Sequence, residues 1–238
     1  KFVVKVVGFI LIIEYLFLFI STTIAYYYRE ADMRSLLYSG ALTLAIGLLL
    51  ILTGGIKDKI RVINRRESYL AVTLSWLFFA LFGAFPFFFS GAFPSFTDAF
   101  FEAASGITTT GASVLTDIEA LPHGLLFWRS ILQWLGGMGI IVFSLALMPL
   151  IGGGAAQLFD AEASGLSLDR FRPKVAQMAK RLWAIYLVLT ASLFILLFVG
   201  PMNLFDALCH SFTTISTGGF STKQSSIAFW DSLYIENV

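Results

Sequence analysis

Two short stretches rich in threonine, serine and glycine hold the residues of this sequence best suited to binding an ion. They are Thr108-Thr109-Thr110-Gly111 and Ser216-Thr217-Gly218-Gly219. Because glycine adopts backbone angles that other residues avoid, such a stretch can turn successive carbonyl oxygens toward one axis. Carbonyls arranged in this way replace the hydration shell of a monovalent cation. Both stretches are therefore candidate strands of an ion-selectivity filter whose backbone carbonyls bind the cation.

The two stretches belong to one internal repeat. Residues 98–113 align with 206–221 at a constant offset of 108 (206 − 98), with Asp, Ala, Ile, Thr, Gly and Ser recurring in register. Each stretch follows a short apolar segment, 98–107 or 204–215, and a bilayer crossing needs about 20 residues. Irregular backbone survives in a membrane only where protein buries it or where it lines water. One isolated Thr/Gly stretch would more often be a turn or a packing face, but two copies in register predict re-entrant pore helices, each followed by a pore loop.

Composition places these repeats in an all-α integral membrane protein. Hydrophobic residues make up 58% of the 238 residues and charged residues only 13%, whereas soluble domains carry about 25% charged residues. The net charge of +1 and the lack of a dense basic face give no support to nucleic-acid binding. The apolar stretches predict membrane spans at 3–28, 36–56, 69–89, 125–151 and 182–199.

Basic residues predict the orientation of the chain. Of 16 lysines and arginines, two lie in the first five residues, five in 57–66 and five in 170–181. Because such residues accumulate in cytoplasmic loops, we expect the N-terminus and both segments to be cytoplasmic and both Thr/Gly stretches to lie in the outer half of the membrane. Setting the topology is the simpler role of these charges, and binding a cytosolic partner or anionic lipid is the alternative.

The expected organisation has four parts. Residues 1–66 form two extra N-terminal spans and a basic loop, 67–159 the first helix–pore loop–helix repeat, 160–181 a second basic loop, and 182–238 a second repeat truncated in its last helix. Two repeats do not close a ring around a pore. The apolar stretch 227–235 suggests that another span has begun, so we expect the chain to be part of a longer protein.

Both pore-loop stretches resemble a known family. Thr-Thr-Thr-Gly-Ala-Ser (108–113) and Ile-Ser-Thr-Gly-Gly-Phe-Ser (215–221) are similar to the first and second pore loops of the TrkH/KtrB/HKT superfamily of potassium and sodium transporters. Trp-Leu-Gly-Gly-Met-Gly-Ile (134–140) resembles the glycine-rich second helix of its first repeat, and the two extra N-terminal spans resemble the TrkH branch.

The resemblance implies four repeats around one pore, of which this chain holds the N-terminal half. It implies that Gly111 and Gly219 are filter glycines, which go with potassium as the bound ion. It also implies a homodimer in the plasma membrane, the inner membrane in a bacterium, with a ring of cytosolic nucleotide-binding regulatory subunits of the TrkA/KtrA type. The nucleotide would bind that partner, so no organic cofactor is expected on this chain.

Two other function classes stay open at this point. A membrane-embedded enzyme would use Asp98, Asp206 and His210, or His123, although no HExxH, GxSxG or clustered metal-ligand pattern accompanies them. A non-conducting assembly subunit is the other alternative. Because aspartate is favoured at helix N-caps, we expect Asp98 and Asp206 to cap the two short helices.

Four polar residues lie in or beside apolar segments. Glu102 and His210 occupy the same repeat position, where we expect packing with hydrogen bonding and, as an alternative, tuning of the field at the pore mouth. Arg129, near the outer end of its helix, is expected to reach the membrane interface. Glu14 lies within the first span and is expected to be functional, paired or directed at a neighbouring helix.

Overall fold

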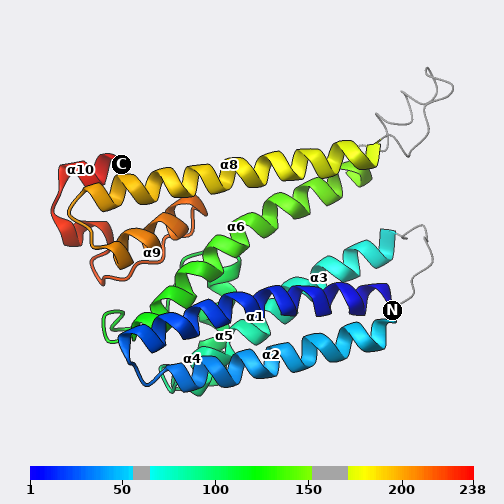
Figure 1. Ribbon diagram of the computed structural model, residues 1–238, viewed down its shortest axis with the longest axis horizontal. Coiled ribbons are helices and arrows are strands. Elements are labelled where there is room, and N and C mark those ends of the chain that lie inside the picture. The colour runs from blue at the N-terminus through cyan, green and yellow to red at the C-terminus, as the bar shows by residue number, and fades with distance from the viewer. Residues whose placement is uncertain (56–64, 152–170) are drawn as a thin grey trace.

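The computed structural model describes residues 1–55, 65–151 and 171–238, with side chains described for 1–55, 66–139 and 177–238. Every regular element in the described part is helical, which confirms the all-α prediction. The long helices lie along the long axis of the molecule (Figure 1) and are α1 (Phe2–Tyr28), α2 (Met33–Gly54), α3 (Arg65–Gly83), α6 (His123–Ile151) and α8 (Phe171–Val199).

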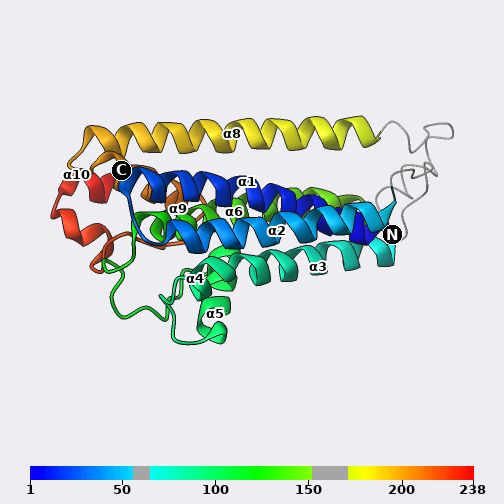
Figure 2. The same cartoon turned by 60° about the horizontal axis from the view of Figure 1, so that its bottom comes forward.

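The short helices gather in the half of the molecule opposite the N-terminus (Figure 1). In Figure 2, α8 forms one edge of the molecule, and α4 and α5 lie at the opposite edge. The short elements are α4 (Phe85–Phe89), α5 (Phe96–Ile107), α9 (Leu204–Ile215), the 3-10 helix η2 (Ser226–Trp230) and α10 (Leu233–Asn237).

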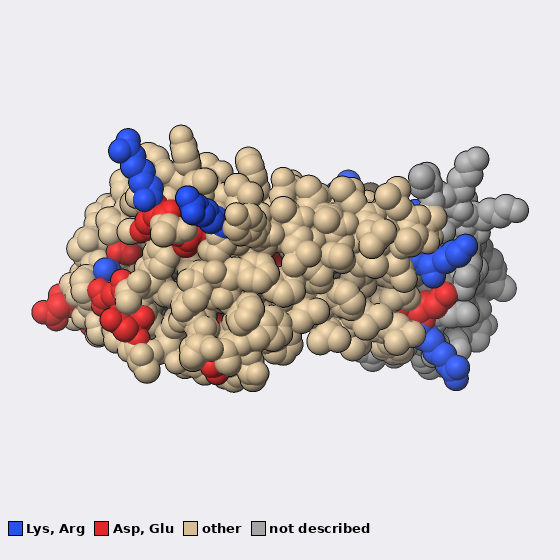
Figure 3. All heavy atoms as spheres, turned by 90° about the horizontal axis from the view of Figure 1, so that it is seen from below, with Lys and Arg blue, Asp and Glu red and all other residues tan. Residues whose placement is uncertain are grey.

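Length and apolarity fit a membrane-spanning fold. Among the described residues, four helices are long and apolar enough to cross a bilayer: Phe2–Tyr28, Met33–Gly54, Arg66–Phe89 and Gln177–Val199. With 29 residues, α6 is about 43 Å long, and a hydrocarbon core is about 30 Å thick. Figure 3 shows Lys, Arg, Asp and Glu gathered near the two ends of the molecule, with a broad band between them almost free of charge on that face.

The described helix ends group as the charge pattern predicted. The N-terminus, the end of α2, the start of α3, the end of α6 and the start of α8 all lie at one end of the molecule (Figure 1). Most of the segment 57–66, much of 160–181 and the expected boundary at 159/160 lie outside the described residues, so a partner-binding role for these segments stays a prediction. Helix α8 begins at Phe171, and the last residues of the expected second basic loop are therefore helical.

The expected span 69–89 is built from two helices. Helix α3 ends at Gly83 and α4 starts at Phe85, with the break placed just before Pro86. Proline has no N–H and cannot continue the helical ladder. The Gly83 carbonyl at this break accepts a hydrogen bond of 2.9 Å from the indole N–H of Trp128 on α6. This hydrogen bond links the end of α3 to α6.

The apolar stretch 227–235 is not one continuous helix. A left-handed Asp231 (φ 41°) separates η2 from α10. Helix α10 packs against the end of α8, where the Tyr234 hydroxyl donates to the Leu196 carbonyl at 2.9 Å and Ile235 is buried. Ile235 and Trp230 of these short elements pack in one apolar cluster with residues of α8 and α9.

Candidate functional site

Helices α5 and α9 begin with the same capping arrangement. The Ser95 hydroxyl accepts from the Asp98 amide at 3.1 Å and donates to the Asp98 carboxylate at 2.7 Å. Asn203 makes the equivalent pair of bonds with Asp206, both at 2.8 Å. The N-caps are therefore Ser95 and Asn203, and the two aspartates stand three residues later, where their carboxylates accept hydrogen bonds from the N-cap side chains. The prediction that Asp98 and Asp206 cap the two helices is therefore wrong, because Ser95 and Asn203 take the N-cap position and accept the helix amides.

The two Thr/Gly stretches, which we name loop A (residues 108–113) and loop B (residues 216–221), leave these helices in the same way. Thr109 and Thr217 have left-handed φ angles of 55° and 56°. Their amides donate to the carbonyls of Gly106 and Thr214, each at 2.9 Å. A β-branched residue with positive φ is an outlier, and such outliers persist only where the surroundings enforce them. The same outlier occurs twice, at the 108-residue offset.

The predicted filter glycines also share a conformation. Gly111 has φ 75° and Gly219 has φ 84°, angles that strain any residue with a Cβ atom. A Cβ atom at Gly219 would meet nothing within 4 Å, whereas one at Gly111 would overlap the Gly218 carbonyl oxygen. Loops A and B therefore touch, backbone to backbone, at Gly111 and Gly218. All eight sequence-predicted residues lie in this pair of loops.

Each loop is hydrogen-bonded by a side chain of the short helix that precedes it, at the same position of the repeat. Glu102 on α5 accepts from the Ser113 hydroxyl at 2.9 and 3.1 Å. His210 on α9, at the same repeat position, lies 2.9 Å from the Ser221 hydroxyl through Nε2. All four side chains follow the 108-residue offset. The predicted role of packing with hydrogen bonding is thus observed for Glu102 and His210.

Arg129 on α6 joins the two loops. Its side chain is 1% exposed and forms an ion pair with the fully buried Glu102, with Nη2 2.8 Å from Oε1. Nη1 donates to the Ser221 carbonyl at 3.1 Å, and the guanidinium lies 4.2 Å from the centroid of the Phe220 ring. The prediction that Arg129 reaches the membrane interface is wrong, because a buried carboxylate and a loop carbonyl draw the side chain inward.

Two neighbouring glycines let α6 pass close to both short helices, which lie on either side of it in Figure 1. A Cβ atom at Gly136 would overlap the Ile107 carbonyl at the end of α5. A Cβ atom at Gly137 would lie 2.9 Å from the Cβ of Ser216, just after α9, and 2.7 Å from the Tyr186 hydroxyl. The glycine-rich segment of α6 thus holds the ends of α5 and α9 at a fixed separation.

Gln133 is a site residue that the sequence reasoning missed. It is fully buried on α6, and its side-chain oxygen accepts from the Phe220 amide of loop B at 3.0 Å. Arg129 and Gln133 are four residues apart and therefore share one helix face. The sequence signal that could have identified Gln133 was this pair of polar residues, four positions apart, inside the apolar stretch 125–151.

Glu14 on α1 is also fully buried. Its carboxylate makes no hydrogen bond with the described residues and lies against α3, where a Cβ atom at Gly83 would be 3.4 Å from Oε1. Of the expected alternatives, Glu14 therefore faces a neighbouring helix.

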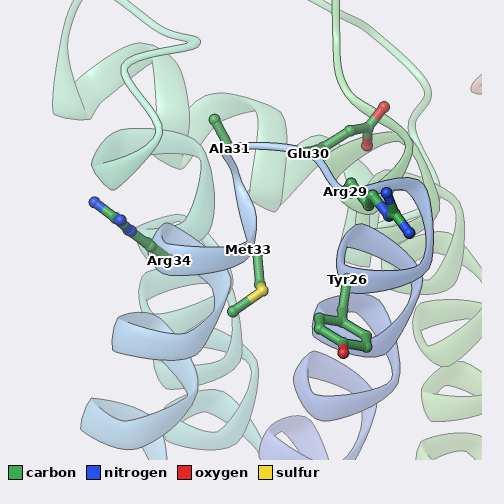
Figure 4. A pocket seen from close by; sticks show the side chains of 6 residues that line it. All are labelled: Tyr26, Arg29, Glu30, Ala31, Met33 and Arg34. Atoms are coloured by element: carbon green, nitrogen blue, oxygen red, sulfur yellow. The ribbon is translucent and has the colours of Figure 1, made fainter.

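An open hollow of about 590 Å³ lies at the turn between α1 and α2. Figure 4 shows the side chains of Arg29, Glu30 and Arg34 pointing in different directions, so no set of polar groups converges there. The residues that line it are Tyr26, Arg29, Glu30, Ala31, Met33 and Arg34.

Comparison with known proteins agrees with this geometry. Residues 39–238 match the sequence model of the TrkH family, described as a cation transport protein. The chain belongs to the TrkH family. A Trk system potassium uptake protein TrkH from Escherichia coli strain K12 is 41% identical over 239 residues, covering 99% of this chain and 49% of the relative. Its counterpart from Halomonas elongata is 36% identical over 238 residues, with the same two coverages.

A solved structure shares the fold. The crystal structure of the potassium transporter TrkH from Vibrio parahaemolyticus matches with a TM-score of 0.83 and 33% identity, over 99% of this chain and 47% of that one. The family resemblance inferred from loops A and B is therefore confirmed. The chain spans about half the length of the curated TrkH relatives it matches.

The residues that an enzyme would use have other partners in this TrkH-family chain. The Asp206 carboxylate accepts from the Thr222 hydroxyl, at 2.6 Å, and Nδ1 of His210 lies 2.8 Å from the Asp206 carbonyl. Both the amide and the ring of His123 bond to Glu30 at 2.7 Å. Among the described residues, no group of three or more His, Cys, Asp or Glu side chains could hold a metal ion. The family is described as a cation transport protein, so the match favours transport over the membrane-embedded enzyme.

Proposed function

We propose that this chain contributes two of four filter strands to a potassium uptake transporter. The carbonyls of loops A and B bind the ion, supplied by Thr108, Thr109, Thr110 and Gly111 and by Ser216, Thr217, Gly218 and Gly219. The observation that carries the proposal is the backbone conformation that recurs in the two loops. Two 12-residue helices end in the same left-handed threonine and positive-φ glycine, and their loops meet at Gly111 and Gly218.

The electrostatics of this arrangement favour a cation. Loops A and B directly follow the C-termini of α5 and α9, and a helix C-terminus carries about half a negative charge. Two such ends support a cation between the loops. The positive charge of Arg129, the guanidinium that contacts both loop regions, is balanced by Glu102 at 2.8 Å.

The names of the relatives support potassium as the ion. The E. coli and H. elongata relatives are named potassium uptake proteins, and the glycines at 111 and 219 match the pattern that goes with potassium in this superfamily. The two remaining strands come from the half of the transporter that lies outside this chain. The complete assembly is a homodimer in a bacterial inner membrane, with a cytoplasmic N-terminus and a cytosolic nucleotide-binding subunit of the TrkA/KtrA type.

Ion flux in proteoliposomes containing the full-length transporter tests the proposal. Potassium uptake should exceed sodium uptake, and Gly111→Ser and Gly219→Ser should each remove that preference. Gly91→Ser is the matched control, because Gly91 has a similar φ of 73° and open space around it but lies outside both loops. Unchanged selectivity in both loop variants would refute the filter assignment. A wild-type protein without flux would favour the assembly-subunit alternative.

A further inference from the structure

The amide of Gln133 has a fixed orientation between the loops. The Phe220 amide can only donate, so the oxygen of Gln133 must face it, at 3.0 Å. The nitrogen, Nε2, then points to the other side, where it makes no hydrogen bond with the described residues. A Cβ atom at Gly111 would lie 3.7 Å from this nitrogen. The side chain therefore lies where loops A and B meet.

A side chain is excluded at Gly218 for a different reason than at Gly111 and Gly219. Its φ is not positive, so its backbone conformation accepts other residues. A Cβ atom at Gly218 would overlap the Gln133 amide, and the three atoms nearest to it all belong to Gln133. Loop A has Thr110 at the matching repeat position. Gln133 thus explains why the two loops differ in sequence at this point.

We propose that Gln133 is a positioning residue that sets the spacing between loops A and B, and with it the ion selectivity of the filter. The proposal rests on the proposed function. The Gly218 carbonyl faces Gly111. The Gln133 amide occupies the place that a Cβ atom on residue 218 would take. The bond from Phe220 fixes loop B two residues further on. Loop B is therefore held from one side by Gln133 and from the other by loop A.

A double-mutant cycle in the full-length transporter separates this role from simple packing. The variants are Gly218→Ala, Gln133→Ala and the two combined, and the measurement is the potassium-to-sodium permeability ratio. Gly218→Ala should lower the ratio about tenfold, as expected for a disturbance of roughly 1.4 kcal/mol. In the Gln133→Ala background the same change should alter the ratio by less than about threefold, because the overlapping atoms are gone.

Single substitutions test the hydrogen bond itself. Gln133→Leu keeps a side chain of similar bulk but leaves the buried Phe220 amide without its acceptor, and should lower the ratio about tenfold. Gln177→Leu, at an exposed position on α8, is the control and should leave the ratio unchanged. If variants do not conduct, the midpoint of thermal unfolding in detergent is measured instead of the permeability ratio. Gly218→Ala should then lower this midpoint less in the Gln133→Ala background than in the wild-type protein.

Two results would overturn the proposal: an equal effect of Gly218→Ala in both backgrounds, or a wild-type ratio in Gln133→Leu. Both apply when the wild-type protein is potassium-selective. A wild-type protein without selective flux would instead overturn the proposed function, and the cycle in thermal unfolding would then still decide whether Gln133 positions loop B.

Discussion

Replacing Arg129 with methionine should destabilise the protein more than any surface substitution. The change keeps an unbranched apolar stem but removes the guanidinium. Glu102 is fully buried, so its charge loses its partner in a place that water does not reach. The Ser221 carbonyl loses a donor at 3.1 Å, and the Phe220 ring loses a cation 4.2 Å from its centroid.

The expected cost follows from this geometry. Removing one partner of a buried ion pair costs about 3–5 kcal/mol, mainly because the remaining charge is left uncompensated. Glu102 keeps bonds from the Ser113 hydroxyl and the Val114 amide, which favours the lower half of that range. Adding Glu102→Gln to Arg129→Met removes the stranded charge. The double variant should therefore be about 2 kcal/mol more stable than Arg129→Met alone.

The assay is the free energy of unfolding of the purified full-length protein in detergent, measured for both single variants and the double variant. Arg181→Met, at an exposed position on α8, is the control and should change stability by less than about 0.5 kcal/mol. An Arg129→Met variant as stable as Arg181→Met would show that the buried ion pair does not stabilise the fold. A double variant no more stable than Arg129→Met would show that the stranded charge of Glu102 is not the source of the lost stability.

Two further predictions concern packing and pH. Gly136→Ala should lower the stability measured by thermal unfolding by about 1–3 kcal/mol, because the added methyl group overlaps the Ile107 carbonyl. Gly139→Ala, whose methyl group would make only ordinary contacts, should leave the stability unchanged or raise it. Equal effects of the two substitutions would refute this explanation. Burial, more than any neighbouring charge, raises the pKa of Asp32 from 3.8 to about 6. The folded state therefore holds the proton more tightly, and stability should fall as the pH rises from about 4 to 6. Asp32→Asn should raise the unfolding temperature at pH 7.5 and have little effect at pH 4; a pH-independent effect would contradict the cause given.

The parts of the fold predicted well are those decided locally. Helix α9 runs over 204–215 as expected, because a Gly-Pro break precedes it and a Ser/Thr/Gly stretch ends it. Helix α5 starts two residues before the expected 98 because Ser95, not Asp98, is its cap. Local sequence indicates that a cap is present, but which of two polar residues three positions apart takes the N-cap position depends on where the preceding turn places the chain.

The contacts of α6 could not be predicted from the sequence. An apolar stretch of this length predicts a span but not which face meets which helix. The direction of Arg129 depends on Glu102, 27 residues earlier, and on loop B, about 90 residues later. Such long-range pairing leaves no local pattern. The polar spacing from Arg129 to Gln133 indicates a shared face, and only the folded chain shows that this face meets both loops.

These contacts assign α6 a role that the internal repeat alone does not suggest. The repeat gives each loop its own helix and its own supporting side chain, so the loops could have been independent units. Instead Arg129, Gln133, Gly136 and Gly137 follow one another at helical spacing and contact α5, α9 and both loop regions. A single helix face thus sets the distance between two loops encoded 108 residues apart. Substitutions on that face should therefore disturb both loops together, whereas substitutions at Glu102 or His210 should act first on the loop that each supports.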